Sequence, residues 1–227
     1  MKVAIQLAMP AELHALPGIR EAEVLDTVAG VPVFRLPSGV LAAAGGVGKV
    51  NAAMAAELLC LRFGAELILN AGVAGCLTEL PVGALVVVDE FVQHDVDTSA
   101  VGDPVGLVST VNRTSFSTWE PERCRGLLRE LGFAASTGRA ATGDWFAVRG
   151  ERAAWVRDTF HPVLAEMEGG AIAQVCLRSG VRCAAVKSVS DHLFSPKQAE
   201  EYFDFGHALK TLGGAVAPLA EKLQEMD

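Results

Sequence analysis

Apolar runs of strand length alternate with segments of helical spacing along the chain, and this alternation limits the fold more than any other feature. Residues 67–71 and 84–91 are apolar without a polar alternation, which is typical of strands buried on both faces. Apolar residues recur at helical spacing within 49–63. Because such strands need helices above and below them, the sequence predicts an α/β fold. We expect one single-domain, three-layer α/β/α sandwich with a mixed central sheet over residues 1–227.

The other expected elements are shorter or less regular. Gly and Pro mark the breaks between them, as is usual for turns. Further strands are expected at 2–7, 22–28, 31–36, 40–44, 134–142, 163–166 and 182–190, and helices at 11–16, 120–131, 151–160 and 169–179. Residues 72–83 and 95–119 are expected to be loops, the second of them functional because of its length. A last amphipathic helix is expected to open at Pro196 and Lys197 and to run nearly to Asp227.

Composition excludes several classes of protein. The formal net charge is −8 and no Lys/Arg cluster is present, so we expect no nucleic-acid partner. Apolar stretches are interrupted by charges or turn residues, and the chain enters a strand at once, so neither a membrane span nor a leader is expected. The five cysteines are scattered without pairing, which is typical of core thiols in a reducing compartment. We therefore expect a cytoplasmic protein without metal or cofactor.

Several carboxylates lie where expected strands end, next to small residues. Glu12 follows the first strand, Glu166 and Glu168 close a short one, and Asp191 closes an apolar one. Ligands of α/β sandwiches collect at such strand ends, and a lone charge that closes an apolar run is costly without a task. Asp144 also follows a strand, but capping of a helix is at least as good an interpretation there. Glu166 has the alternative of pointing away from Glu168.

Other chemistries find less support. The Gly45–Gly48 turn precedes a helix and could hold an anion, but glycine-rich turns are common for packing alone. No GxSxG nucleophile motif is present, and Cys60 and Cys176 have no histidine near them in sequence. A metal site is not predicted from His94, Asp95 and Asp97, because these three residues alone are too few potential ligands.

Taken in order, the polar and glycine-rich segments resemble the nucleoside phosphorylase/nucleosidase superfamily, and most closely its bacterial 5'-methylthioadenosine/S-adenosylhomocysteine nucleosidases. The resemblance spans nearly the whole chain. It is carried by Met9-Pro-Ala-Glu12, Gly46-Val-Gly-Lys-Val-Asn-Ala-Ala53, Asn70-Ala-Gly-Val-Ala-Gly75, Thr142-Gly-Asp-Trp-Phe146, Glu166-Met-Glu168 and Ser188-Val-Ser-Asp191, with Val82-Gly83 and His94-Asp-Val-Asp97 between them. Each motif alone is weak, whereas the ordered set is fairly specific.

The resemblance implies a hydrolase that cleaves the N-glycosidic bond of 5'-methylthioadenosine, S-adenosylhomocysteine and related nucleosides such as 5'-deoxyadenosine, in methionine salvage. It implies that Asp191 is the general acid that protonates the leaving adenine and that Glu12 activates the attacking water. It implies that Glu168 grips the ribose hydroxyls. The remaining substrate-binding positions that it implies are Met9, Val47, Val73, Gly75, Phe146, Ala147, Glu166, Met167 and Ser190.

Two positions depart from this resemblance. Val73 stands where the nucleosidases usually carry Ser, and Lys187 stands where they usually carry Arg. Both changes alter hydrogen bonding near the site. Because of these two changes, a hydrolase acting on futalosine or aminodeoxyfutalosine remains an alternative function. A purine nucleoside phosphorylase is disfavoured, because the stretches that would present arginines to phosphate contain none. A non-catalytic nucleoside-binding protein is the other class considered.

The resemblance also concerns the rim of the site. It implies a homodimer in which the loop after His94 of one subunit closes the 5' pocket of its neighbour. It further implies that an aromatic residue of Tyr202-Phe203-Asp204-Phe205 covers that pocket, without indicating which one.

Overall fold

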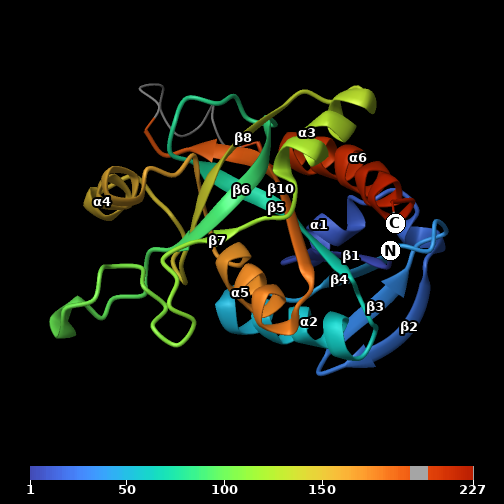
Figure 1. The fold of residues 1–227 in the computed structure, drawn as a ribbon. Helices are drawn as coiled ribbons and strands as arrows, with labels where there is room; N and C mark the ends of the chain where they lie inside the picture. Colours follow the sequence, from blue (N-terminus) through green and yellow to red (C-terminus); the bar gives the residue numbers. More distant parts are fainter. Residues whose placement is uncertain (195–203, 227) are drawn as a thin grey trace.

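The computed structural model describes residues 1–194 and 204–226. A ten-stranded sheet runs through it in the order β10-β6-β8-β9-β5-β1-β4-β3-β2, with β7 beside β6 (Figure 1). The strands are β1 (Val3–Leu7), β2 (Glu23–Val28), β3 (Val31–Arg35), β4 (Leu41–Ala44), β5 (Leu67–Cys76), β6 (Leu85–Gln93), β7 (Phe116–Ser117), β8 (Ala135–Thr142), β9 (Leu164–Glu166) and β10 (Arg182–His192). The helices are α1 (Pro10–His14), α2 (Lys49–Leu61), α3 (Pro121–Glu130), α4 (Glu151–Phe160), α5 (Gly169–Ser179) and α6 (Phe205–Gln224).

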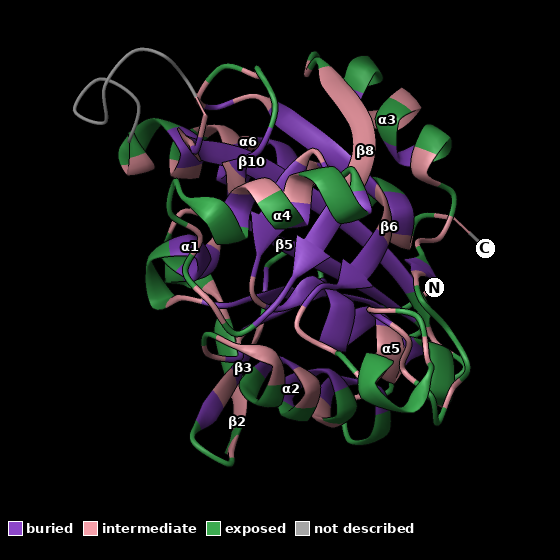
Figure 2. Ribbon diagram, turned by 90° about the vertical axis from the view of Figure 1, so that its left-hand side faces the viewer, coloured by how far each residue is buried: buried purple, intermediate pink, exposed green. Residues whose placement is uncertain are grey.

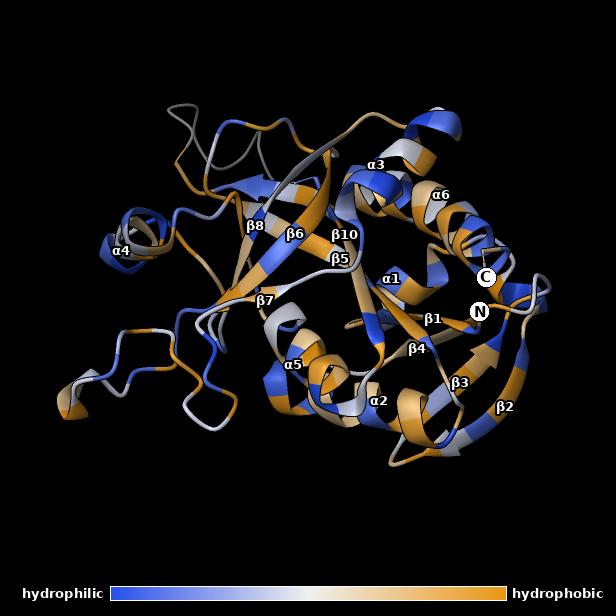
Figure 3. Ribbon diagram, in the orientation of Figure 1, coloured by the Kyte–Doolittle hydropathy of each residue, from blue (hydrophilic) through white to orange (hydrophobic). Residues whose placement is uncertain are grey.

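Helices cover both faces of the sheet because successive residues of its central strands face opposite sides. Ala4 and Ile68 belong to the core beneath α2 and α5, whereas Ile5 and Leu69 belong to the core beneath α6. Figure 1 shows these helices on opposite sides of the strands, Figure 2 shows the strands as the most buried layer, and Figure 3 shows how apolar they are. Parallel and antiparallel pairs both occur. The expected three-layer α/β/α sandwich with a mixed sheet is confirmed.

Strand β5 is longer than the sequence predicts. The expected strand ends at Ala71 and a loop follows, but β5 continues to Cys76. Its second half pairs along its length with β10, and Gly75 and Cys76 pair with β9 as well. Small residues and glycines carry little strand propensity of their own, so pairing with neighbouring strands decides the structure here. The expected loop at 72–83 is therefore wrong over its first five residues.

One further expectation needs correction, and another falls partly outside the described residues. Residues 95–119 are not all loop, because they contain a 3-10 turn at Ser99–Val101 and the two-residue strand β7. The last helix begins at Phe205 in the described residues, where the Asp204 carboxylate accepts a hydrogen bond from the backbone N–H of His207. The expected opening of this helix at Pro196 and Lys197 lies outside the described residues.

The cysteines and the helices agree with the composition-based expectations. All five cysteines are buried and free. Four of them, Cys60, Cys76, Cys176 and Cys183, belong to the core beneath α2 and α5, and Cys124 belongs to the core beneath α6. None of the helices within residues 1–194 and 204–226 combines the length and the hydropathy that a membrane crossing needs.

Candidate active site

Every residue that the sequence singled out for chemistry or substrate binding lines one cavity of about 400 Å³. This volume lies in the range of pockets that hold small molecules. The cavity opens where β1, β5 and β10, which run parallel, reach their carboxyl ends. The residues in question are Met9, Glu12, Val47, Val73, Gly75, Phe146, Ala147, Glu166, Met167, Glu168, Ser190 and Asp191.

Glu12 is held rigidly at one side of the cavity. Its side chain is 2% exposed, and its Oε2 accepts hydrogen bonds from the backbone N–H groups of Ala8 (3.0 Å) and Met9 (2.9 Å). Its Oε1 accepts one from the N–H of Val73 at 2.9 Å. A side chain at Gly72 would crowd this carboxylate, since a Cβ there would lie 3.0 Å from Oε1. Among the described residues, Oε1 accepts this one hydrogen bond, which leaves its second lone pair for a ligand in the cavity.

Glu166 and Lys187 form a buried ion pair behind the cavity. Lys187 Nζ lies 3.0 Å from Glu166 Oε2, and the two side chains are 2% and 1% exposed. The same Oε2 accepts from the N–H groups of Glu168 and Gly169 at the start of α5, where a helix favours negative charge. Burial alone would lower the pKa of Lys187, but Glu166 and Glu168 raise it overall. Glu166 therefore does not point away from Glu168, the alternative considered above.

The pKa of the Glu168 carboxyl lies well above the ordinary value of a glutamate. Burial and the neighbouring Glu166 raise its pKa to about 7, against the opposing influence of Lys187 and of the Gly48 N–H. That N–H, at the start of α2, donates to Glu168 Oε1 at 2.9 Å. Gly48 has φ +93°, a conformation that side-chain-bearing residues rarely adopt. The N–H group at the end of the Gly45–Gly48 turn, which could have bound an anion, thus donates to the Glu168 carboxylate of the same chain.

Asp191 reaches the cavity through an irregularity in β10. The register of β10 against β5 shifts between Val189 and Asp191, so Ser190 and Asp191 both line the cavity although neighbours on a regular strand face apart. Burial raises the pKa of Asp191, opposed by the Ser190 hydroxyl and by His192. The Ser190 Oγ lies 2.7 Å from Asp191 Oδ1 and 3.2 Å from the carbonyl oxygen of Ala74. Its single proton serves one of them at a time.

The loop between β8 and α4 supplies another part of the cavity lining. Phe146 and Ala147 line the cavity, and the Phe146 side chain is 67% exposed. Asp144 does not line the cavity. Its Oδ1 accepts the N–H of Lys49 at 2.8 Å and so caps α2, which agrees with the capping interpretation.

The cavity lining includes residues that the sequence did not single out. Ala74 and Trp145 lie within the motifs quoted above, and Ala8 and Ala165 lie one position outside theirs, so each of them adjoins a predicted site residue in the chain. Phe205 also lines the cavity, at the start of α6. It belongs to the aromatic segment expected to cover the 5' pocket, whereas Tyr202 and Phe203 of that segment lie outside the described residues.

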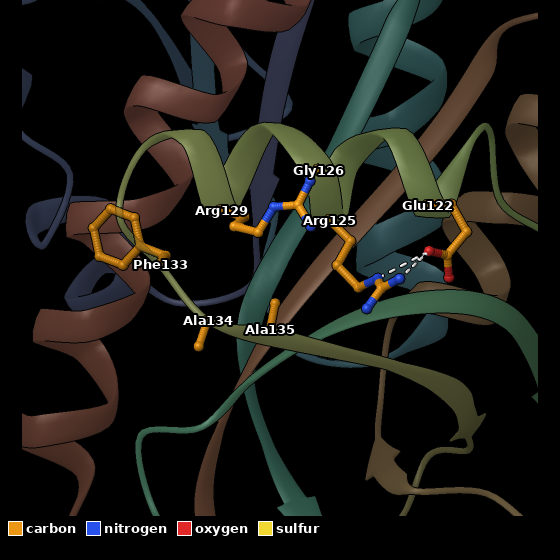
Figure 4. Close-up of a pocket in the computed structure, with 7 residues that line it drawn as sticks. All are labelled: Glu122, Arg125, Gly126, Arg129, Phe133, Ala134 and Ala135. Carbon is orange, nitrogen blue, oxygen red and sulfur yellow. Dashed lines mark hydrogen bonds and ion pairs between the residues drawn. The ribbon is translucent and has the colours of Figure 1, made fainter.

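A second cavity, of about 420 Å³, lies between α3 and the start of β8 (Figure 4). Its one carboxylate among the lining residues is Glu122, an exposed side chain that already pairs with Arg125. The remaining lining residues are Gly126, Arg129, Phe133, Ala134 and Ala135. The buried acidic groups are instead concentrated in the cavity that Glu12 and Asp191 share.

A mixed sheet with a carboxylate-lined cavity at its strand ends is typical of α/β enzymes that act on nucleosides. Residues 2–223 match the family described as the phosphorylase superfamily, and the chain belongs to this superfamily.

Individual relatives carry more specific names. A 5'-methylthioadenosine/S-adenosylhomocysteine nucleosidase of Geobacillus thermodenitrificans is 39% identical over 199 residues, which cover 84% of each chain. An aminodeoxyfutalosine nucleosidase of Campylobacter jejuni is 33% identical over 78% of each chain. The crystal structure of the Campylobacter jejuni 5'-methylthioadenosine/S-adenosyl homocysteine nucleosidase superposes with a TM-score of 0.85, at 29% identity over 99% of both chains.

Proposed function

We propose that the chain hydrolyses the N-glycosidic bond of 5'-methylthioadenosine and S-adenosylhomocysteine, releasing adenine and a 5'-substituted ribose. The observation that carries this proposal is the charge of the cavity. Its described lining contains four carboxylates and no lysine or arginine. A phosphate dianion would be repelled there, because it needs charge-assisted donors. Water is therefore a better attacking group than phosphate, and the named relatives are nucleosidases.

Asp191 is the proposed general acid. Adenine is a poor leaving group until it is protonated, and an acid that acts near neutral pH must keep its proton there. Burial raises the pKa of Asp191 in this direction. The proton passes from the Asp191 carboxyl to N7 of the departing base, so that the bonding electrons leave with a neutral adenine. The sugar carries positive charge as the bond breaks.

Glu12 and Glu168 are the proposed partners of the water and the sugar. Backbone N–H groups fix both oxygens of Glu12, and the free lone pair of Oε1 takes a proton from water as it attacks the sugar carbon. Glu168 Oε1 is held by Gly48, and Oε2 has no partner among the described residues, which leaves it for the ribose hydroxyls. An ionised Glu168 stabilises the positive sugar more than the neutral substrate, which is the condition for catalysis.

Apolar side chains account for the rest of the proposed substrate contacts. Phe146 stacks on the base, and the backbone of Ala147 reads its edge. Met167 packs against the ribose. The 5' substituent lies among Met9, Val47 and Phe205, an apolar environment suited to an alkylthio group.

Aminodeoxyfutalosine or futalosine is the second candidate substrate. It is favoured by the relatives from Campylobacter jejuni and Helicobacter pylori that are named aminodeoxyfutalosine nucleosidases. Val73, which lines the cavity, and Lys187 are the positions that depart from the usual nucleosidase pattern.

We propose that the protein is a cytoplasmic enzyme, that it forms a homodimer and that it acts in methionine salvage. Support for the dimer comes from large apolar side chains that are exposed along α2 and in the loop after His94. Val50 is 80% exposed, Leu61 74%, and Val101, in the loop after His94, 80%. Exposed apolar side chains mark interfaces where they lie together, and Val50 and Leu61 share one helix. Sedimentation velocity tests the dimer: we expect twice the chain mass, and Val50→Lys with Leu61→Lys should yield monomers.

A panel of nucleosides in phosphate-free buffer tests the function. Base release should be detected for 5'-methylthioadenosine, S-adenosylhomocysteine and 5'-deoxyadenosine, and its rate should not rise when phosphate is added. Release from aminodeoxyfutalosine or futalosine alone would transfer the assignment to the second candidate. A requirement for added phosphate would contradict hydrolysis.

A further inference from the structure

The loop that carries Phe146 is attached to two other segments of the chain at Asp144. The backbone N–H of Asp144 donates to Asp95 Oδ2 at 2.9 Å, and the Asp144 carboxylate accepts the Lys49 N–H at 2.8 Å. Asp95 follows β6, and Lys49 opens α2. Three segments far apart in the sequence thus meet two residues before Phe146.

Lys49 also forms an ion pair with Asp95, so Lys49, Asp95 and Asp144 all contact one another. Its Nζ lies 2.7 Å from Asp95 Oδ1, and the two side chains are only 19% and 18% exposed. Nζ also donates to Gln93 Oε1 at 3.3 Å, and the Gln93 amide donates to Gln174 Oε1 of α5 at 2.8 Å. Partial burial makes such a pair stronger than a surface ion pair. Burial alone would raise the pKa of Asp95, but Lys49 and the Asp144 N–H lower it overall.

The next residue of the loop is fixed by its ring contacts. Trp145 packs edge-on against His94, with ring centroids 5.9 Å apart, and the Arg152 guanidinium lies 4.6 Å from the centre of its ring. His94 and Asp95 are neighbours, so one short segment after β6 holds both Asp144 and Trp145. Lys49, Asp95 and Asp144 do not line the cavity, whereas Trp145, Phe146 and Ala147 do.

From this arrangement we infer that Asp95, held by Lys49, is a positioning residue that fixes the base-binding loop and so sets the affinity for adenine and its nucleosides. The inference rests on the proposed function for the identity of the base. Asp95 acts on the reaction only through the loop. Its loss should therefore weaken binding of the base and leave the chemical step, which depends on Glu12 and Asp191, largely intact.

Asp95→Asn tests this role, because it keeps the size of the side chain and removes the charge that pairs with Lys49. The dissociation constant of free adenine, measured by calorimetry, should rise about tenfold, since hydrogen bonds to charged groups matter by roughly 1.5–3 kcal/mol. KM for 5'-methylthioadenosine should rise by a similar factor, while kcat stays within about threefold. Lys49→Met should reproduce the effect, and the double variant should add little to Asp95→Asn.

Asp97→Asn is the matched control. Asp97 lies in the same segment and accepts a hydrogen bond from the N–H of Ser99 only within that segment, so its loss should leave adenine binding unchanged. If Asp95→Asn does not fold, Lys49→Met carries the test by itself. Unchanged adenine affinity in the folded variants, or a fall in kcat without a change in KM, would overturn the inference.

Adenine binding also separates this inference from the proposed function. A wild-type protein that binds adenine but releases none from any nucleoside would contradict the proposed hydrolysis alone, and the effect of Asp95→Asn on adenine affinity would still decide the positioning role. A wild-type protein that does not bind adenine would overturn both.

Discussion

The two sides of the cavity are built differently. On the side proposed for the sugar, Glu12 and Glu166 are buried carboxylates that accept backbone hydrogen bonds from the β1–α1 turn, from β5 and from the start of α5. On the side proposed for the base, Phe146 is 67% exposed and belongs to a loop whose Asp144 N–H donates to Asp95.

This difference indicates a division of labour. Groups that transfer protons need fixed geometry and a controlled pKa, and rigid elements provide both. Aromatic groups that stack on a flat base tolerate small displacements, so a loop suffices. We therefore expect changes on the sugar side and at Asp191 to affect turnover or stability, and changes on the base side to affect affinity.

Asp191→Asn should have the largest effect. The amide cannot donate an acid proton to the leaving base, so kcat should fall by about 10²- to 10⁴-fold, the usual contribution of general acid catalysis. The dissociation constant of adenine should change by less than about threefold. Stopped-assay kinetics and calorimetry measure the two quantities. Unchanged turnover would refute the role of Asp191.

Lys187→Met should follow, as a loss of stability. It leaves the Glu166 carboxylate buried without its cation, which costs about 3–5 kcal/mol in free energy of unfolding. Chemical denaturation measures this. Arg125→Met is the control, because its pair with Glu122 is exposed and should contribute less than about 1 kcal/mol. Equal effects in the two variants would show that burial of the Lys187 pair is unimportant.

Phe146→Ala tests the base side. Stacking of a base on an aromatic ring contributes about 1–3 kcal/mol, so KM should rise by roughly 5- to 100-fold with a much smaller change in kcat. The comparison fails if kcat falls as far as it does in Asp191→Asn.

The smallest effect concerns Glu168 and pH. Its pKa is raised from 4.5 to about 7 in the folded chain, so the folded state binds a proton more tightly than the unfolded state does. The resulting stabilisation is complete below pH 4.5 and is lost as the pH rises through about 7. The melting temperature of the wild type, relative to Glu168→Gln, should fall by a few degrees between pH 5 and pH 8. A constant difference would contradict the raised pKa.

Apolar periodicity predicted the layers of the fold, because it is a local feature of the sequence. The residues around the cavity were implied mainly by the resemblance to the nucleosidases, which short motifs in the right order carry. It did not predict β5 beyond Ala71, since Gly72 and Gly75 become strand only through pairing with β10 and β9. Nor did it predict the pairing of Lys187 with Glu166, 21 residues apart, or of Lys49 with Asp95, 46 apart, because the fold alone brings these charges together.

The bulge in β10 is a second feature that the sequence could not supply. Asp191 was expected at the end of an apolar strand, but the register shift that lets both Ser190 and Asp191 line the cavity depends on how β10 pairs with β5. Trp145 was within a recognised motif, yet its contacts with His94 and Arg152 arise only when three segments meet.

The source of the oxygen atom in the sugar product tests the central claim most directly. The wild-type protein is incubated with 5'-methylthioadenosine in ¹⁸O-labelled water with phosphate present, and the sugar is analysed by mass spectrometry. Attack by water that Glu12 activates predicts free 5-methylthioribose carrying one ¹⁸O atom. A sugar 1-phosphate as the product would contradict this account of the cavity.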